Sequence, residues 1–155
     1  MSSMETFTII REISGELEMQ QLGSRIARIL HSGQVIALKG PLGVGKTTLV
    51  RAILRSLGVT GAVRSPTYNL VESYTECGLN LHHFDFYRFS DPVELEEAGF
   101  RELFSSDAVC IVEWPENAAE FMSNPDLTIE IHYVGVGRQV RISTDRVNQD
   151  LLDYI

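Results

Sequence analysis

Residues 35–48 read VIALKGPLGVGKTT. This segment opens with a continuous apolar run, Val35 to Leu38, which is typical of a strand buried on both faces of a sheet. After Lys39 the chain matches G-x4-G-K-[ST], the spacing of a phosphate-binding loop, and apolar residues then recur at helical period over 46–57. A strand, a glycine-rich turn and a helix in this order predict a site for the phosphates of a nucleotide.

Each residue type in this loop has a physical role. Glycines allow a tight turn that points backbone N–H groups at phosphate oxygens, and the helix start adds its positive dipole. Lys46 can reach the β- and γ-phosphates, and the Thr47 hydroxyl can coordinate Mg²⁺. We expect the nucleotide phosphates to be bound by Gly40, Pro41, Leu42, Gly43, Val44, Gly45, Lys46, Thr47 and Thr48.

Two further mostly apolar runs end on a carboxylate. Residues 81–85 read LHHFD and end at Asp85, and residues 109–113 read VCIVE and end at Glu113. Strand ends meet the phosphates in this class of fold, so we expect both carboxylates near Lys46. Glu113 would join the metal shell or orient the attacking water, and Asp85 would be the second metal-side carboxylate. The predicted catalytic set is therefore Lys46, Asp85 and Glu113, and the predicted Mg²⁺ ligands are Thr47, Glu113 and Asp85.

Neighbouring residues allow two readings each. Thr67, in the Pro66-stiffened segment RSPTY, resembles a switch residue that senses the γ-phosphate, or belongs to a turn leading into a strand. Trp114 either covers the nucleotide or fills the core. His82 and His83 are adjacent in a strand and must face opposite ways, so they cannot form one metal site. We interpret both histidines as structural.

The remaining patterns predict an α/β domain. Strands are expected over Phe7–Ile10, Asn69–Tyr74, Leu79–Tyr87 and Ala108–Glu113, the second and third forming a hairpin. Helices are expected over Gly15–Leu30 with Ser14 as the N-cap, and from Asp91-Pro92 onward. Strict alternation around 129–133 and 140–142 predicts a last antiparallel hairpin with one solvated face. We expect one domain over residues 1–155, with a mostly parallel central sheet flanked by helices and extended by antiparallel hairpins.

Composition narrows the function. The chain has 155 residues, 44% of them hydrophobic, and a formal net charge of −8. This acidic balance disfavours binding of nucleic acid or anionic membranes through bulk charge. Cys77 and Cys110 lack metal-ligand spacing and are expected as free thiols in a reducing compartment. The first residues do not follow the order of a secretion signal, so we expect a cytoplasmic protein.

Four segments together resemble a known family. They read GPLGVGKTT at 40–48, SPTYNLVESY at 65–74, HHFDFYRFSDPVELEEAGF at 82–100 and IVEWPE at 111–116. In order and spacing they are similar to the bacterial TsaE-type ATPases of tRNA threonylcarbamoyladenosine biosynthesis. The resemblance implies a small cytoplasmic P-loop ATPase that is required for threonylcarbamoyl modification of adenosine 37 in tRNAs reading ANN codons.

The resemblance also implies ligands and partners. ATP and Mg²⁺ would be bound, and the protein would act on the TsaB–TsaD pair, whose TsaD subunit transfers the group, so that tRNA is met only indirectly. Asp85 resembles the Walker B-like position and Thr67 the switch threonine, while Glu16 falls where the family contacts the adenine side of ATP. Pro41 and Val44 replace an acidic residue and an alanine that are commoner there, which can alter turnover or partner contact.

Two alternatives remain open from the residues alone. A small-molecule kinase of the same fold would need room for an acceptor, and no long insertion between the motifs supplies it. A binding module could use ATP only to fix a conformation for docking, without useful hydrolysis. A GTPase is disfavoured because no N-K-x-D motif occurs in the chain.

Overall fold

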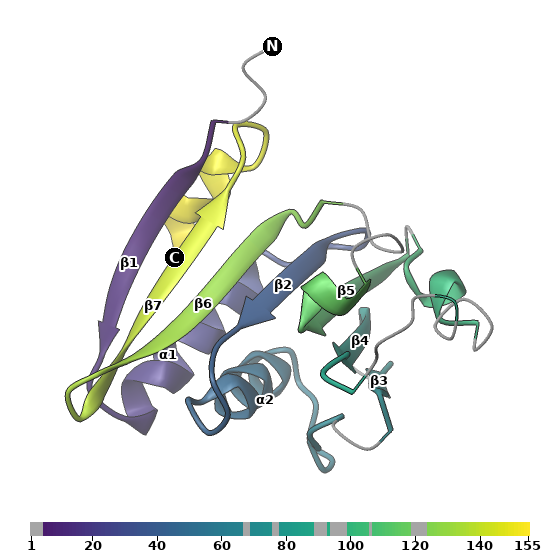
Figure 1. The fold of residues 1–155 in the computed structure, drawn as a ribbon, viewed down its shortest axis with the longest axis horizontal. Helices are drawn as coiled ribbons and strands as arrows, with labels where there is room; N and C mark the ends of the chain where they lie inside the picture. The colour runs from purple at the N-terminus through teal and green to yellow at the C-terminus, as the bar shows by residue number, and fades with distance from the viewer. Residues whose placement is uncertain are drawn as a thin grey trace.

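The computed structural model describes residues 5–66, 69–75, 78–88, 93, 99–105, 107–118 and 124–155. One seven-stranded sheet runs through the molecule in the order β1-β7-β6-β2-β5-β4-β3 (Figure 1). Its strands are β1 (Phe7–Ile13), β2 (Val35–Lys39), β3 (Val71–Tyr74), β4 (Asn80–Asp85), β5 (Ala108–Glu113), β6 (Leu127–Val134) and β7 (Gly137–Thr144). The helices are α1 (Glu16–Arg28) and α2 (Lys46–Ser56), with short 3-10 turns η1 (Phe100–Leu103), η2 (Pro115–Ala118) and η3 (Gln149–Tyr154).

The sheet has a parallel centre and antiparallel borders. Strand β2 lies between β6 and β5 and is parallel to both, and β5 is parallel to β4. The pairs β1–β7, β7–β6 and β3–β4 are antiparallel. The predicted fold class is therefore confirmed. The last hairpin is more closely joined to the centre than its sequence suggests, because β6 pairs with β2 as well as with β7.

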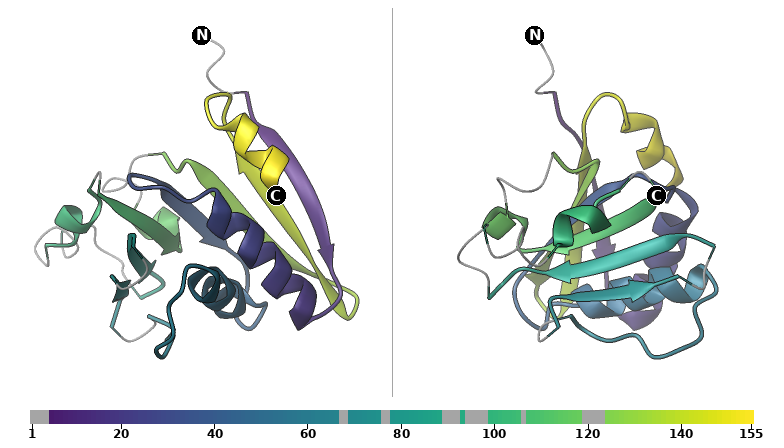
Figure 2. Two further views of the ribbon diagram at one scale, coloured as in Figure 1. Left: turned by 180° about the vertical axis from the view of Figure 1, so that it is seen from behind. Right: turned by 90° about the vertical axis from the view of Figure 1, so that its right-hand side faces the viewer.

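Helices α1 and α2 cover one face of the sheet, and η3 lies on the same side (Figure 2). The larger apolar cluster fills this layer and includes Leu22, Ile26, Leu49 and Ile53 from the two helices. The two helices touch closely at Gly23, where an added Cβ would lie 2.5 Å from the Cβ of Ala52. This contact fixes how α2, and the loop before it, sits on the sheet.

A smaller cluster covers the opposite face. It contains Phe84 and Phe86, together with Cys110, Val112 and Ala118, and Phe104 stacks on Phe84 with ring centroids 4.7 Å apart. Because side chains alternate along a strand, β4 and β5 each supply both layers. Leu81 and Ile111 point to the helical layer, whereas Phe84 and Val112 point away from it.

Two predictions near the first helix need correction. Strand β1 extends to Ile13 instead of ending at Ile10, because Arg11 and Glu12 continue the alternation and pair with β7. Ser14 is not the N-cap: helix α1 has Gly15 at that position, without a side-chain cap. The Ser14 hydroxyl instead donates to Glu18 Oε1 at 2.6 Å, and the Ser14 backbone N–H donates to Glu18 Oε2 at 2.9 Å.

Some predictions fall outside the described part of the chain. These are the helix start at Asp91-Pro92, the switch residue Thr67 and the free thiol Cys77. Within the described residues, neither α1 nor α2 nor any other helix has the length and apolar character needed to cross a membrane.

Candidate functional site

The phosphate-binding motif forms a loop between the end of β2 and the start of α2 (Figure 1). Its glycines are needed for shape. Gly40 has φ 155°, and an added Cβ there would lie 2.8 Å from the backbone oxygen of Ile131. Gly45, directly before the helix, has φ 119°, in the left-handed region that favours glycine. Helix α2 then begins at Lys46. The backbone N–H groups of its first turn, which have no partner within the helix, therefore lie next to the backbone of the loop, as an anion-binding site requires.

Lys46 and Glu113 meet across this loop. Lys46 Nζ lies 3.2 Å from Glu113 Oε1 and donates a hydrogen bond of 2.6 Å to the backbone oxygen of Gly40. It also lies 5.6 Å from the ring centroid of Trp114. Both charged side chains are buried, so their attraction is weakly screened by water. The structure thus brings the predicted lysine and one predicted carboxylate together.

Asp85 ends the neighbouring strand at the same level. In the parallel pairing of β4 with β5, Asp85 is the Cα partner of Glu113. Its Oδ1 accepts a hydrogen bond of 3.0 Å from the backbone N–H of Tyr87, and the residue is 7% exposed. Two buried carboxylates therefore stand side by side at the strand ends that face the phosphate-binding loop.

Glu113 is held in its ionised form. Burial acts to raise the pKa of this carboxyl, but the hydrogen bond with His83 and the nearby Lys46 ammonium outweigh burial and lower the pKa below its ordinary value. A carboxylate at neutral pH can accept hydrogen bonds or bind a cation through either oxygen. Glu113 is thus available as a negatively charged ligand or as an acceptor for water.

His83 is the residue that the sequence interpretation missed. It is fully buried, and its Nε2 lies 2.7 Å from Glu113 Oε2. The two histidines do face opposite ways: His82 Nδ1 lies 2.7 Å from the Ser73 hydroxyl and its ring contacts Phe84 edge-on. Alternation along β4 contains the missed signal, because His83 is two residues before Asp85 and so shares its face.

An aromatic pair borders the carboxylates. The rings of Tyr87 and Trp114 have centroids 4.9 Å apart, and Trp114 has the left-handed φ of 57°. Trp114 lines a cavity of about 160 Å³ together with Gly40, Pro41, Lys46 and Glu116. Its ring is half-buried beside the loop.

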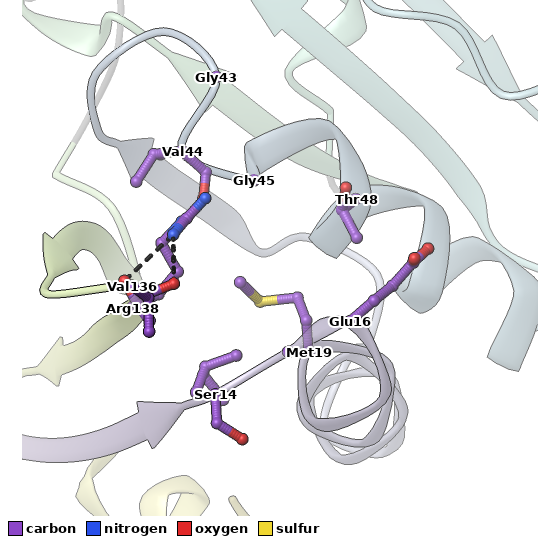
Figure 3. A pocket seen from close by; sticks show the side chains of 12 residues that line it. Ser14, Glu16, Met19, Gly43, Val44, Gly45, Thr48, Val136 and Arg138 are labelled. Carbon is purple, nitrogen blue, oxygen red and sulfur yellow. Dashed lines mark hydrogen bonds between the residues drawn. The ribbon is translucent and has the colours of Figure 1, made fainter.

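A second cavity of about 300 Å³ lies on the other side of the loop (Figure 3). Its lining comes from the end of β1 and the start of α1, from the loop and the start of α2, and from the β6–β7 turn and the start of β7: Ile13, Ser14, Gly15, Glu16, Met19, Gly43, Val44, Gly45, Thr48, Val136, Gly137 and Arg138. Glu16 and Thr48 thus face one hollow, as expected if Glu16 contacts the base side of a nucleotide whose phosphates reach the loop. Arg138 had no predicted role; its Nε donates a 2.8 Å hydrogen bond to the Val44 backbone oxygen.

The donor groups fit Mg²⁺ bound with a nucleotide. In the described part of the chain, no three His, Cys, Asp or Glu side chains gather as a metal site. Mg²⁺ does not need such a cluster, since it binds through one or two carboxylates, phosphate oxygens and waters. Thr47, in the first turn of α2, and the carboxylates Asp85 and Glu113 offer oxygen ligands of this kind.

A strand, a glycine-rich loop and a helix, with a loop lysine facing a strand-end carboxylate, place the protein in the class of P-loop folds. Over residues 13–140 the sequence matches the family described as "Threonylcarbamoyl adenosine biosynthesis protein TsaE". The chain belongs to this TsaE family.

Comparisons with individual proteins agree with this family assignment. A tRNA threonylcarbamoyladenosine biosynthesis protein TsaE from Haemophilus influenzae is 40% identical over 144 residues, covering 90% of each chain. The protein of that name from Bacillus subtilis is 36% identical over 118 residues, 76% of this chain and 73% of that one. The crystal structure of Bacillus subtilis YdiB superposes with a TM-score of 0.80 at 25% identity, covering 96% of this chain and 93% of that one.

Proposed function

We propose that this protein binds ATP with Mg²⁺ and hydrolyses it in the service of threonylcarbamoyl modification of adenosine 37 in tRNAs reading ANN codons. The observation that carries the proposal is the 3.2 Å ion pair between Lys46 Nζ and Glu113 Oε1 beside the glycine loop. This ion pair supports the proposal because it joins the lysine of the glycine loop to a strand-end carboxylate, the two kinds of group that phosphoryl transfer requires. Family membership supports the tRNA modification step.

Each group would have a separate task. The loop N–H groups and the α2 N-terminus bind the phosphates, and Lys46 turns from Glu113 to the β- and γ-phosphate oxygens. Thr47 and Asp85 hold the metal side, while Glu113 joins them or orients the attacking water. Bound Mg²⁺ supplies neutralisation of the phosphate charge. The cavity at Glu16 receives the base side of ATP, and Trp114 covers the nucleotide at the other end of the loop.

We further propose that the protein acts in the cytoplasm on the TsaB–TsaD pair and meets tRNA only through these partners. The net charge of −8 supports this, because an acidic surface repels the phosphate backbone of a nucleic acid. The favourable anion contacts are concentrated at the loop, which the nucleotide itself would occupy.

ATP hydrolysis by the purified protein, with and without TsaB–TsaD, tests the proposal. We expect slow turnover alone, faster turnover with the partners, and a loss of at least about 100-fold in Lys46→Ala. Arg146→Ala is the control, because Arg146 is exposed in the turn after β7 and also bears a positive charge. Unstimulated turnover that is equal in Lys46→Ala and the wild type would reject the ATPase assignment.

A second candidate is an ATP-dependent docking module without useful hydrolysis. It is favoured by the contacts of Glu113, both of whose oxygens already have partners, Lys46 and His83. Glu113→Ala separates the two candidates: threonylcarbamoyl transfer that continues after hydrolysis has stopped would favour the docking module. The kinase alternative predicts that γ-labelled ATP passes its label to a small molecule in the same assay.

A further inference from the structure

His83 is set into the helical layer of the sheet directly behind the carboxylates. It is fully buried on β4, and its Cα partner on β5 is Ile111, two residues before Glu113. Residues in this diagonal relation on neighbouring strands lie within reach of a long side chain. The two side chains do meet here, since His83 Nε2 lies 2.7 Å from Glu113 Oε2.

The hydrogen bonding of the ring assigns its tautomer. Among the residues that the structure describes, none pairs with His83 Nδ1, although that atom is buried. A hydrogen on Nδ1 would therefore be a buried donor without an acceptor, which is costly. With the hydrogen on Nε2 the ring instead donates to the Glu113 carboxylate, which can only accept, and Nδ1 is left as an unpaired acceptor.

The two partners of Glu113 differ in mobility. Lys46 reaches Oε1 on a long flexible chain and also bonds the Gly40 carbonyl, so it can leave for a phosphate. His83 is a buried ring on a strand that is hydrogen-bonded on both sides, to β3 and to β5. One carboxylate oxygen thus has a partner that can move, and the other has a partner that is fixed.

We propose that His83 is a positioning residue, which anchors Glu113 Oε2 so that Oε1 is presented to the nucleotide site when Lys46 turns to the phosphates. This inference rests on the proposed ATPase function. His83 itself touches neither the loop nor the phosphates; it restricts the rotamers of Glu113. Partners that orient a metal-side or catalytic carboxylate in this way commonly change activity about 10- to 100-fold when removed.

Two substitutions at one position separate anchoring from packing. His83→Leu removes the donor and fills the space, whereas His83→Gln retains an N–H donor at the position equivalent to Nε2. We expect kcat for ATP to fall about 10- to 100-fold in His83→Leu, with KM unchanged within about threefold. His83→Gln should recover most of that loss. His82→Leu, the same change at the next residue on the opposite face, should keep the wild-type kcat.

Calorimetric titration with Mg²⁺ and a non-hydrolysable ATP analogue gives a readout besides turnover. The dissociation constant should stay within about threefold of wild type in His83→Leu, since the phosphate-binding groups are untouched. A similar kcat loss in His83→Gln and His83→Leu, or an equal loss in His82→Leu, would overturn the positioning role. So would a wild-type kcat in His83→Leu.

NMR of the histidine ring nitrogens tests the anchor without ATP. The nucleotide-free wild-type protein should show a hydrogen on His83 Nε2, and Glu113→Gln should shift the Nε2–H resonance. The opposite tautomer, or a resonance unaffected by Glu113→Gln, refutes the anchor. If the wild type hydrolyses no ATP even with TsaB–TsaD, the proposed ATPase function is rejected. The NMR result still tests the hydrogen bond between His83 and Glu113 on its own.

Discussion

Arg138 on β7 donates a hydrogen bond from Nε to the backbone oxygen of Val44, at 2.8 Å. The same guanidinium lies 4.4 Å from the ring centroid of Tyr133, whose hydroxyl donates to the Leu42 carbonyl at 3.3 Å. The β6–β7 hairpin therefore binds two carbonyls of the phosphate-binding loop, those of Val44 and Leu42, and Figure 3 shows Arg138 beside Val44. The loop owes its shape to this hairpin as well as to its own glycines.

Replacing Arg138 tests how much that support contributes to ligand binding. Arg138→Met keeps the aliphatic stem and removes the charged donor, a hydrogen bond of about 1.5–3 kcal/mol. Because the loop must then be ordered by the ligand, we expect affinity for a non-hydrolysable Mg²⁺–ATP analogue to fall about tenfold in calorimetric titration. Arg141→Met, exposed on the same strand, is the control. Equal affinity in both variants would show that the loop keeps its shape unaided.

The lowered pKa of Glu113 predicts how acid affects folding. A carboxyl whose pKa is lower when folded than when unfolded stabilises the fold above its unfolded pKa, near 4.3, and loses that contribution as the pH falls through the folded value. We expect wild type to exceed Glu113→Gln by about 1–3 kcal/mol in free energy of unfolding at pH 7. The difference should stay level to about pH 5 and shrink below it. Urea unfolding over this range measures it, and a difference that grows in acid would contradict the assignment.

The close approach of α1 and α2 predicts a severe effect of one methyl group. An added Cβ at Gly23 would lie 2.5 Å from Ala52 Cβ and 3.1 Å from the Ile53 nitrogen, so Gly23→Ala must push the helices apart. Overpacking of this kind costs about 1–3 kcal/mol. Gly15→Ala is the control, since nothing lies within 4 Å of its added Cβ. Thermal and urea unfolding should show a loss in Gly23→Ala that clearly exceeds that in Gly15→Ala.

The burial of Cys110 predicts that its thiol is unreactive in the folded protein. The residue is 1% exposed, its Sγ lies 3.3 Å from the Leu103 carbonyl, and burial raises the pKa of the thiol to about 12. Since the thiolate is the reactive form, a Cys77→Ser protein should resist an aromatic disulfide reagent at pH 8. Labelling should accelerate only with added denaturant, in step with unfolding. Rapid labelling of the native protein would contradict the packing around β5.

Much of this arrangement follows from local sequence. The run Val35–Leu38, the glycine spacing and the helical period after Lys46 predict the strand, loop and helix in their correct places. The strand predicted over Ala108–Glu113 coincides with β5. All six residues are buried, as expected for a strand at the centre of a parallel sheet that is covered on both faces. Both strand-end carboxylates could be found because each ends such a run.

The missed features depend on register and on long-range contact. Local alternation puts His83 on the face of Asp85, but its contact with Glu113 also depends on the alignment of β4 with β5, which no local pattern encodes. Arg138 reaches Val44 across 94 positions of the chain, through the pairing of β6 with β2. The prediction of Ser14 as the N-cap is wrong for a local reason. The Ser14 hydroxyl donates its hydrogen bond to the Glu18 side chain and does not accept one from a backbone N–H of the helix.

The pairing of Phe7 with Thr144 places the start of β1 and the end of β7 together, at the end of the sheet opposite to the phosphate-binding loop (Figure 1). A linker attached ahead of β1 would therefore leave the molecule on the far side from Gly43 and the β6–β7 turn. Protein immobilised in this way would present its loop to solution in one orientation. Nucleotide binding could then be followed on a sensor surface without the tether shielding the loop.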